Sequence, residues 1–167
     1  VDVRGGGPAG RILATANGAG EVRGMVGNAR AEAPSTPQGK LNVAGVVGSS
    51  GYLSVIKDLG MREPYSGMVE LQSGEIGDDL AHYLGRSEQT PSAVGIGVFV
   101  VPAGVVEAAG GFLIQLLPGL SESEVDRIEQ QIAALPHPTR LIRDGLTPEE
   151  VLQNVFGNDV EIHDRYP

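Results

Sequence analysis

The sequence contains no cysteine and no tryptophan. Without cysteine this chain forms neither a disulfide nor a thiolate metal site. Aromatic residues are few, with three phenylalanines and four tyrosines, so Val, Ile, Leu and Ala must build the core. No apolar run approaches the roughly 18 residues of a membrane helix, and the N-terminus has no signal pattern of charged and then apolar residues. These absences favour a cytoplasmic protein with neither a disulfide nor a membrane span.

Basic residues are also scarce: 12 stand against 21 acidic ones, which gives a net charge of −9 at pH 7. Such a surface repels phosphate backbones and anionic lipids, so neither nucleic acid nor a membrane is expected as a partner. The imbalance is strongest from Ser121 onward, where ten acidic residues accompany four basic ones. Residues 120–167 are therefore predicted to form an acidic, helical segment.

Glycine, by contrast, is abundant, with 25 residues beside 11 prolines. Many turns and short elements are expected from this composition rather than a bundle of long helices. A chain of 167 residues is long enough for one domain, and 41% hydrophobic content is ordinary for a folded protein. We therefore expect residues 1–167 to form a single domain.

Gly5, Gly7 and Gly10 fit the dinucleotide-binding spelling G-x-G-x-x-G. That motif holds a pyrophosphate only where its third glycine opens a helix. Residues 11–26 show instead two short alternating runs, which predict a β-hairpin with Gly18 in its turn. No cofactor is therefore expected at these glycines.

Three later stretches have the apolar spacing of amphipathic helices: 73–89, 122–135 and 148–156. Each begins at, or directly after, a residue that is typical of helix N-caps: Ser73, Ser121 and Thr147. Glu124 and Glu150 complete the pattern of a capping box at the second and third of these helices. Arg86 and Glu88, near the end of the first helix, are predicted to tie it to a neighbouring sheet.

Strands are predicted over residues 52–59, 65–71, 93–101 and 110–118, with a last strand or an extended tail over 159–164. The runs 93–101 and 110–118 flank Gly104 and should pair as a hairpin. Both are apolar at nearly every position, which is typical of strands that are covered on both faces. The alternative is that they supply an exposed apolar surface. The fold class is therefore α+β, with antiparallel-rich sheets and helices packed against them.

No catalytic site is evident. His82 has Asp78 and Asp79 one helical turn before it, but such pairs are common on solvated helix faces. His137 and His163 do not repeat at metal-ligand spacing. The sequence contains neither a nucleophile elbow nor a P-loop. The chain is therefore not expected to be an enzyme.

Several stretches resemble one family closely, the 33-kilodalton heat-shock chaperonins, which are redox-regulated bacterial holdases. The residues that carry the resemblance are "GYLSVIKDLGMREPYSG" (51–67), "YLGRSEQTPSAVG" (83–95), "AAGGFLIQLLPG" (108–119) and "GLTPEEVL" (145–152). "GGGP" at 5–8 and "VRG" at 22–24 match in the same order. The resemblance extends over essentially the whole chain.

The resemblance implies the larger part of a chaperone core domain. Members of the family begin with a further upstream region, and they continue past the position of Pro167 into a C-x-C … C-x-x-C module. Those cysteines bind zinc when reduced and form disulfides when oxidised, and no residue here corresponds to them. Residues 120–167 would lead toward that module.

In the family, the core captures unfolding client proteins under oxidative or heat stress without ATP, and it forms a homodimer. Apolar residues that could contact clients here are Val98, Phe99, Val100, Phe112, Ile114 and Leu116. Two other functions stay open. One is a small-ligand enzyme that uses the glycine turns and His82, and the other is an inert dimerisation fragment.

Overall fold

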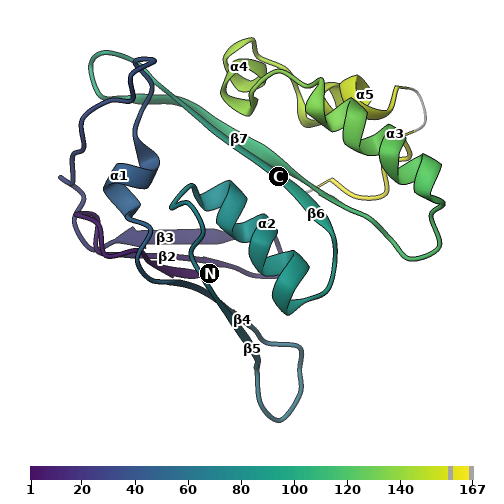
Figure 1. Ribbon diagram of the computed structural model, residues 1–167, viewed down its shortest axis with the longest axis horizontal. Helices are drawn as coiled ribbons and strands as arrows, with labels where there is room; N and C mark the ends of the chain where they lie inside the picture. Colours follow the sequence, from purple (N-terminus) through teal and green to yellow (C-terminus); the bar gives the residue numbers. More distant parts are fainter. Residues whose placement is uncertain (158–159, 166–167) are drawn as a thin grey trace. The chain divides into compact units, whose positions relative to one another are not determined.

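The computed structural model describes residues 1–157 and 160–165, and its elements are shown in Figure 1. Two compact units divide these residues, Val1–Gln89 and Thr90–Arg165. The first contains a five-stranded sheet and two helices, and the second contains a two-stranded sheet and three helices. The predicted α+β class with antiparallel sheets is confirmed. The single domain expected over 1–167 stays a prediction.

The sheet of the first unit is antiparallel throughout, in the order β3-β2-β1-β4-β5. Its strands are β1 (Asp2–Arg4), β2 (Arg11–Ala16), β3 (Val22–Val26), β4 (Tyr52–Lys57) and β5 (Tyr65–Glu70). Val3 and Leu53 are adjacent in the register and both are buried. The strand predictions over 52–59 and 65–71 are confirmed with slightly shorter bounds.

β2 and β3 form the predicted hairpin, with Gly18 in its turn. The side-chain oxygen of Asn17 closes the turn, because it accepts hydrogen bonds from the backbone N–H groups of Ala19 and Glu21 at 3.0 and 3.1 Å. Gly20 has a φ of +81°, which favours glycine. The prediction that a strand rather than a helix follows Gly10 is confirmed.

The glycines near the N-terminus pack against α1 (Val43–Val47). Gly7 donates a backbone hydrogen bond to the carbonyl of Val47 at 2.9 Å, and Ala9 donates one to Val46 at 3.0 Å. A Cβ atom at Gly7 would lie 2.5 Å from the Val46 oxygen, which is too close. Glycine is therefore needed for close approach of two backbones, and the loop is filled by α1 rather than held open for a phosphate.

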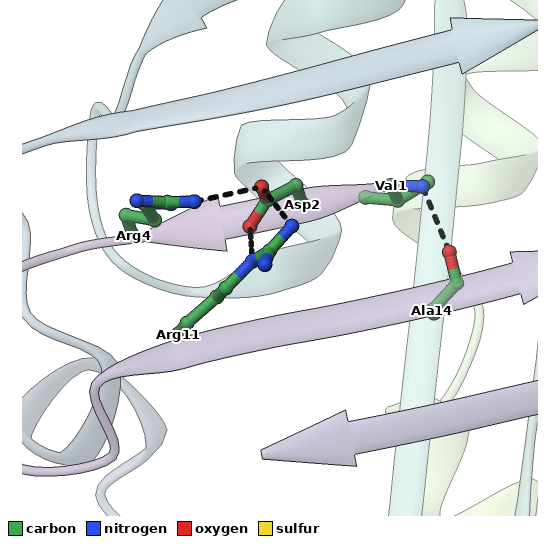
Figure 2. A network of polar contacts seen from close by, with 5 residues as sticks. All are labelled: Val1, Asp2, Arg4, Arg11 and Ala14. Carbon is green, nitrogen blue, oxygen red and sulfur yellow. Dashed lines mark hydrogen bonds and ion pairs between the residues drawn. The ribbon is translucent and has the colours of Figure 1, made fainter. Parts of the chain in front are cut away.

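An ion-pair network joins the first two strands (Figure 2). Arg11 donates from Nε and Nη2 to the two carboxylate oxygens of Asp2, at 3.0 and 2.9 Å. Arg4 approaches the same carboxylate at 3.5 Å. The hydrogen bonds from Arg11 lower the pKa of Asp2. The network fixes β2 beside the central strand β1.

α2 (Ile76–Ser87) begins later than predicted, so the prediction of Ser73 as its N-cap is wrong. Gly74 has a φ of +81° and cannot continue a helix, and a Cβ on it would lie 2.7 Å from the carbonyl oxygen of Gly48. The hydroxyl of Ser73 instead accepts a hydrogen bond from Glu75 N–H at 3.0 Å. Close packing of the loop against the end of α1 therefore decides where α2 starts.

The second unit is built on the antiparallel pair β6 (Ser92–Val100) and β7 (Val106–Gln115), the predicted hairpin with Gly104 in its turn. Its helices are α3 (Glu122–Ala133), α4 (Pro138–Arg143) and α5 (Pro148–Phe156). The predicted helices over 122–135 and 148–156 are confirmed, with both capping boxes. In the described residues, no helix has the length and apolar character needed to cross a bilayer.

α4 was not predicted from the sequence, because six residues that begin with a proline are too few to give a periodic signal. Pro138 opens it, and His137 precedes it and accepts from Thr139 N–H through Nδ1 at 3.3 Å. Residues 160–165 form no regular element, so the strand alternative fails there, while Asp159 lies outside the described residues. Arg165 binds Glu149 of α5 at 2.9 Å.

Candidate functional site

The β6–β7 hairpin has one face covered by α4 and one exposed face. On the covered face, Gly95 is opposite Phe112 and Gly97 is opposite Gly110. A Cβ on Gly95 would lie 2.5 Å from the Phe112 ring and 2.9 Å from Pro138 Cγ, and one on Gly97 would overlap the backbone of α4. The glycines therefore let α4 lie directly on the strands.

The opposite face of the hairpin, which we call the outer face, carries Ile96, Val98, Val106 and Leu113. Their exposed fractions are 45%, 38%, 56% and 51%. Ile96 and Val98 alternate on β6, Leu113 is opposite Val94, and Val106 is opposite Val100 beyond a register shift. All four therefore lie on the face away from Gly95 and Gly97 and form one apolar surface. The expectation that both faces are covered is wrong for this face.

The six residues predicted to contact clients divide between the two faces. Val98 and Val100 lie on the outer face, and Val100 is half-buried. Phe99, Phe112 and Ile114 belong to the covered face, where Ile114 is buried and both phenylalanines are half-buried. Leu116 follows β7 and is half-buried. The sequence could not separate these groups because apolar residues occur on both sides of the strands.

Sequence reasoning missed three outer-face residues, Ile96, Val106 and Leu113. The sequence of residues 93–101 did contain a pattern that indicates the position of Ile96. Gly95 and Gly97 are two apart and must share a face, so Ile96 and its alternate neighbours lie on the other. Small residues on one face of a strand indicate close packing there and leave the large side chains on the opposite face.

Asp79, one of the two acids before His82, is engaged by the backbone of a loop. Asp79 is 1% exposed and its carboxylate accepts backbone hydrogen bonds from Gln72, Ser73 and Gly74 at 2.6, 3.1 and 2.9 Å. Its carboxylate thus binds the loop before α2 and is not a hydrogen-bond partner of His82. Across residues 1–157 and 160–165, no cluster of three histidine or acidic side chains is placed to hold a metal ion.

The end of α2 is tied to the sheet of the first unit. Lys57 of β4 forms an ion pair with Glu88 at 2.5 Å, which confirms the structural role predicted for Glu88. Arg86 makes no hydrogen bond or ion pair with the rest of the described chain and instead lines a groove with His82. Glu88 therefore has the structural role that was predicted for both residues, whereas Arg86 does not tie the helix to the sheet.

Tyr83 is fully buried and lies against Gly67 of β5. A Cβ at Gly67 would be 2.7 Å from the Tyr83 hydroxyl oxygen, so glycine allows the ring to reach the strand. Burial raises the pKa of Tyr83, and the carboxylate of Glu88 raises it further. The phenol is therefore neutral at any physiological pH.

The described residues offer an exposed apolar sheet face and no cluster of histidine and acidic side chains placed to hold a metal ion. Together they define an α+β protein with a candidate protein-binding surface.

A family model described as Hsp33 protein matches residues 1–167, and the chain belongs to this family. The chain is 49% identical over 167 residues to the 33 kDa chaperonin of Bacillus subtilis (strain 168), covering 100% of this chain and 57% of the relative. It is 48% identical over 155 residues to the 33 kDa chaperonin of Thermoanaerobacter sp. (strain X514), covering 93% and 53% of the two chains. The chain thus spans little more than half the length of these relatives.

A solved structure agrees with the fold. The crystal structure of the 33 kDa chaperonin from Thermotoga maritima superposes with a TM-score of 0.87 at 41% sequence identity, covering 96% of this chain and 55% of that chain. The resemblance inferred from the sequence motifs is confirmed.

Proposed function

We propose that this chain is the client-binding core of an ATP-independent holdase, which captures unfolding proteins on the outer face of the β6–β7 hairpin. The observation that carries the proposal is the exposure of Ile96, Val98, Val106 and Leu113 on one sheet face. Membership of the Hsp33 family and the description of its relatives as chaperonins support it, and they favour a chaperone over an enzyme.

The physical basis is the hydrophobic effect. An unfolding client exposes apolar side chains, and covering a half-exposed isoleucine or leucine stabilises the complex by about 1 kcal/mol. The binding free energies of four such residues on one rigid surface add up, and no reaction chemistry is needed. Because α4 holds the covered face, the outer face is already formed before a client arrives, and little ordering is required on the chaperone side.

The proposal is tested by light scattering of a chemically unfolded client diluted into the chain. Ile96→Thr with Leu113→Thr keeps residues that suit a strand but makes the outer face more polar. We expect the double variant to suppress aggregation several-fold less than the parent chain. Leu59→Thr is the matched control, because Leu59 is also exposed but lies in the loop after β4.

Equal suppression by the double variant and the parent would contradict the proposed surface. No suppression by the parent would instead favour the inert dimerisation fragment. A saturable rise in melting temperature with nucleotides or nicotinamide cofactors would favour the enzyme that uses His82. The homodimer and the cytoplasmic location stay predictions.

A further inference from the structure

β5 is an edge strand of the five-stranded sheet, so one side of its backbone has no strand partner among the described residues. An open groove of about 830 Å³ runs beside it. The groove is lined by Met68, Val69 and Glu70 of β5, Gln72 of the following loop, and His82, Arg86 and Ser87 of α2. We call it the β5–α2 groove. It lies wholly within the first unit.

The helical wall of the groove is held in place by buried contacts. Tyr83 is fully buried against Gly67, and the Tyr65 hydroxyl lies 3.3 Å from both the carbonyl oxygen and the hydroxyl of Ser87. Glu88 pairs with Lys57 one residue further along. α2 and β5 therefore form a rigid pair, and the groove between their outer sides is present without a ligand.

The helical wall of the groove is polar, and the strand wall is partly apolar because Met68 and Val69 contribute to it. His82 and Arg86 are four residues apart on α2 and share one side of it. Neither makes a hydrogen bond or an ion pair within residues 1–157 and 160–165, and Arg86 is exposed. On the strand side, Met68 is 64% exposed. The cation Arg86, the acid Glu70, the flexible apolar side chain of Met68 and an unpaired strand edge thus line one groove.

We infer that the β5–α2 groove binds an extended polypeptide segment, which adds to β5 as a further strand and places an acidic side chain against Arg86. Strand addition to an edge supplies main-chain hydrogen bonds that do not depend on sequence, and flanking side chains select the residues of the guest. A guanidinium group favours a carboxylate partner. The inference rests on the proposed function, because the segment would belong to an unfolding client.

Backbone pairing can be tested directly with synthetic peptides. The probe is a fluorescein-labelled peptide of alternating valine and glutamate, and its binding to the 167-residue chain is measured by fluorescence anisotropy. Two further peptides carry N-methyl groups on one edge or on the other. Only one edge of an added strand faces β5, so we expect one methylated peptide to bind like the parent and the other to bind about ten-fold more weakly. Equal affinity of the two methylated peptides would overturn the inference.

Variants locate the site. We expect Arg86→Glu and Met68→Lys each to weaken binding of the unmethylated peptide about ten-fold, and Arg86→Lys to retain most of it. Arg23→Glu and Met25→Lys are the matched controls, because both residues are exposed on β3, the opposite edge of the same sheet. Melting temperatures check that all variants are folded. Equal weakening by the β3 variants would overturn the inference.

The remaining outcomes separate this inference from the proposed function. Intact aggregation suppression with no peptide binding would overturn the groove and leave the holdase. Peptide binding that is sensitive to edge methylation, in a chain that suppresses no aggregation, would support the groove and contradict the holdase. If Met68→Lys abolishes a concentration-dependent dimer in sedimentation, the edge is occupied by a second copy and the assignment to clients is overturned.

Discussion

Asp79 is an acidic residue buried within the first unit and held entirely by backbone donors. Its carboxylate accepts three N–H groups from the loop between β5 and α2, which itself packs on the end of α1. A buried charge costs several kcal/mol unless hydrogen bonds compensate it. Here three charge-assisted bonds replace hydration. The residue therefore fixes the path of the loop and the start of α2.

Asp79→Asn should lower the free energy of unfolding by about 2–3 kcal/mol, because one carboxylate oxygen becomes an NH₂ group facing N–H donors. Urea denaturation followed by circular dichroism measures the change. The control is Asp78→Asn, since Asp78 is exposed in the same turn, and it should cost much less. If both variants lose the same stability, the three hydrogen bonds to Asp79 are not what holds the loop.

At the scale of elements, α3 and α5 begin with capping boxes that differ in detail. Both hydroxyls donate to the glutamate carboxylate, at 3.0 Å for Thr147 and 2.6 Å for Ser121, and the Thr147 hydroxyl also accepts from Glu150 N–H at 3.3 Å. In both boxes the glutamate accepts from the backbone N–H of the cap residue, at 2.7 and 2.8 Å. The pKa of Glu124 is lowered mainly by the Ser121 hydroxyl, and that of Glu150 mainly by the Thr147 backbone.

Thr147→Ala should lower the free energy of unfolding by about 1 kcal/mol, because a terminal N–H of α5 loses its acceptor. Ser121→Ala should cost less, since it removes a donor to an exposed carboxylate, whereas Thr147→Ala removes such a donor and an N–H acceptor as well. Thermal melting at neutral pH compares the two. The opposite order would contradict this assignment of the hydroxyls.

The capping boxes also predict a pH dependence. Because both glutamates have lowered pKa values in the folded chain, their contribution is complete above the ordinary glutamate pKa. It is lost as the pH falls through the lowered values. At acid pH the capping boxes should therefore stabilise α3 and α5 less, and the melting temperature should fall.

For the whole molecule, the absence of cysteine decides how the chain responds to oxidants. Peroxide cannot form a disulfide in it, and no thiolate is present to bind zinc tightly. Its three methionines, Met25, Met61 and Met68, are all exposed and can be oxidised. Methionine sulfoxide is reversed by dedicated reductases rather than by simple thiols.

Aggregation suppression should therefore be the same under dithiothreitol, under peroxide and with a metal chelator. The light-scattering assay described above measures it in each condition. A several-fold gain with peroxide that dithiothreitol reverses would show redox control within this chain. That result would contradict the expectation that such control requires the family's cysteines.

Local sequence was sufficient for most elements. Capping residues marked the starts of α3 and α5, and glycine-punctuated apolar runs marked both hairpins. These signals are local because a cap satisfies N–H groups within one turn and a hairpin joins neighbouring strands. The family, too, could be identified from short motifs and was confirmed.

Tertiary structure decided where α2 begins and which face of the β6–β7 hairpin is exposed. Ser73 was predicted as a helix cap, yet packing of Gly74 on the end of α1 moved the helix start to Ile76. The apolar residues of β6 and β7 did not by themselves indicate the exposed side, which is defined by α4 packing on Gly95 and Gly97. Local patterns specify hydrogen bonds between near neighbours, whereas burial depends on which distant segment arrives, and for these residues that segment lies several elements away in the chain.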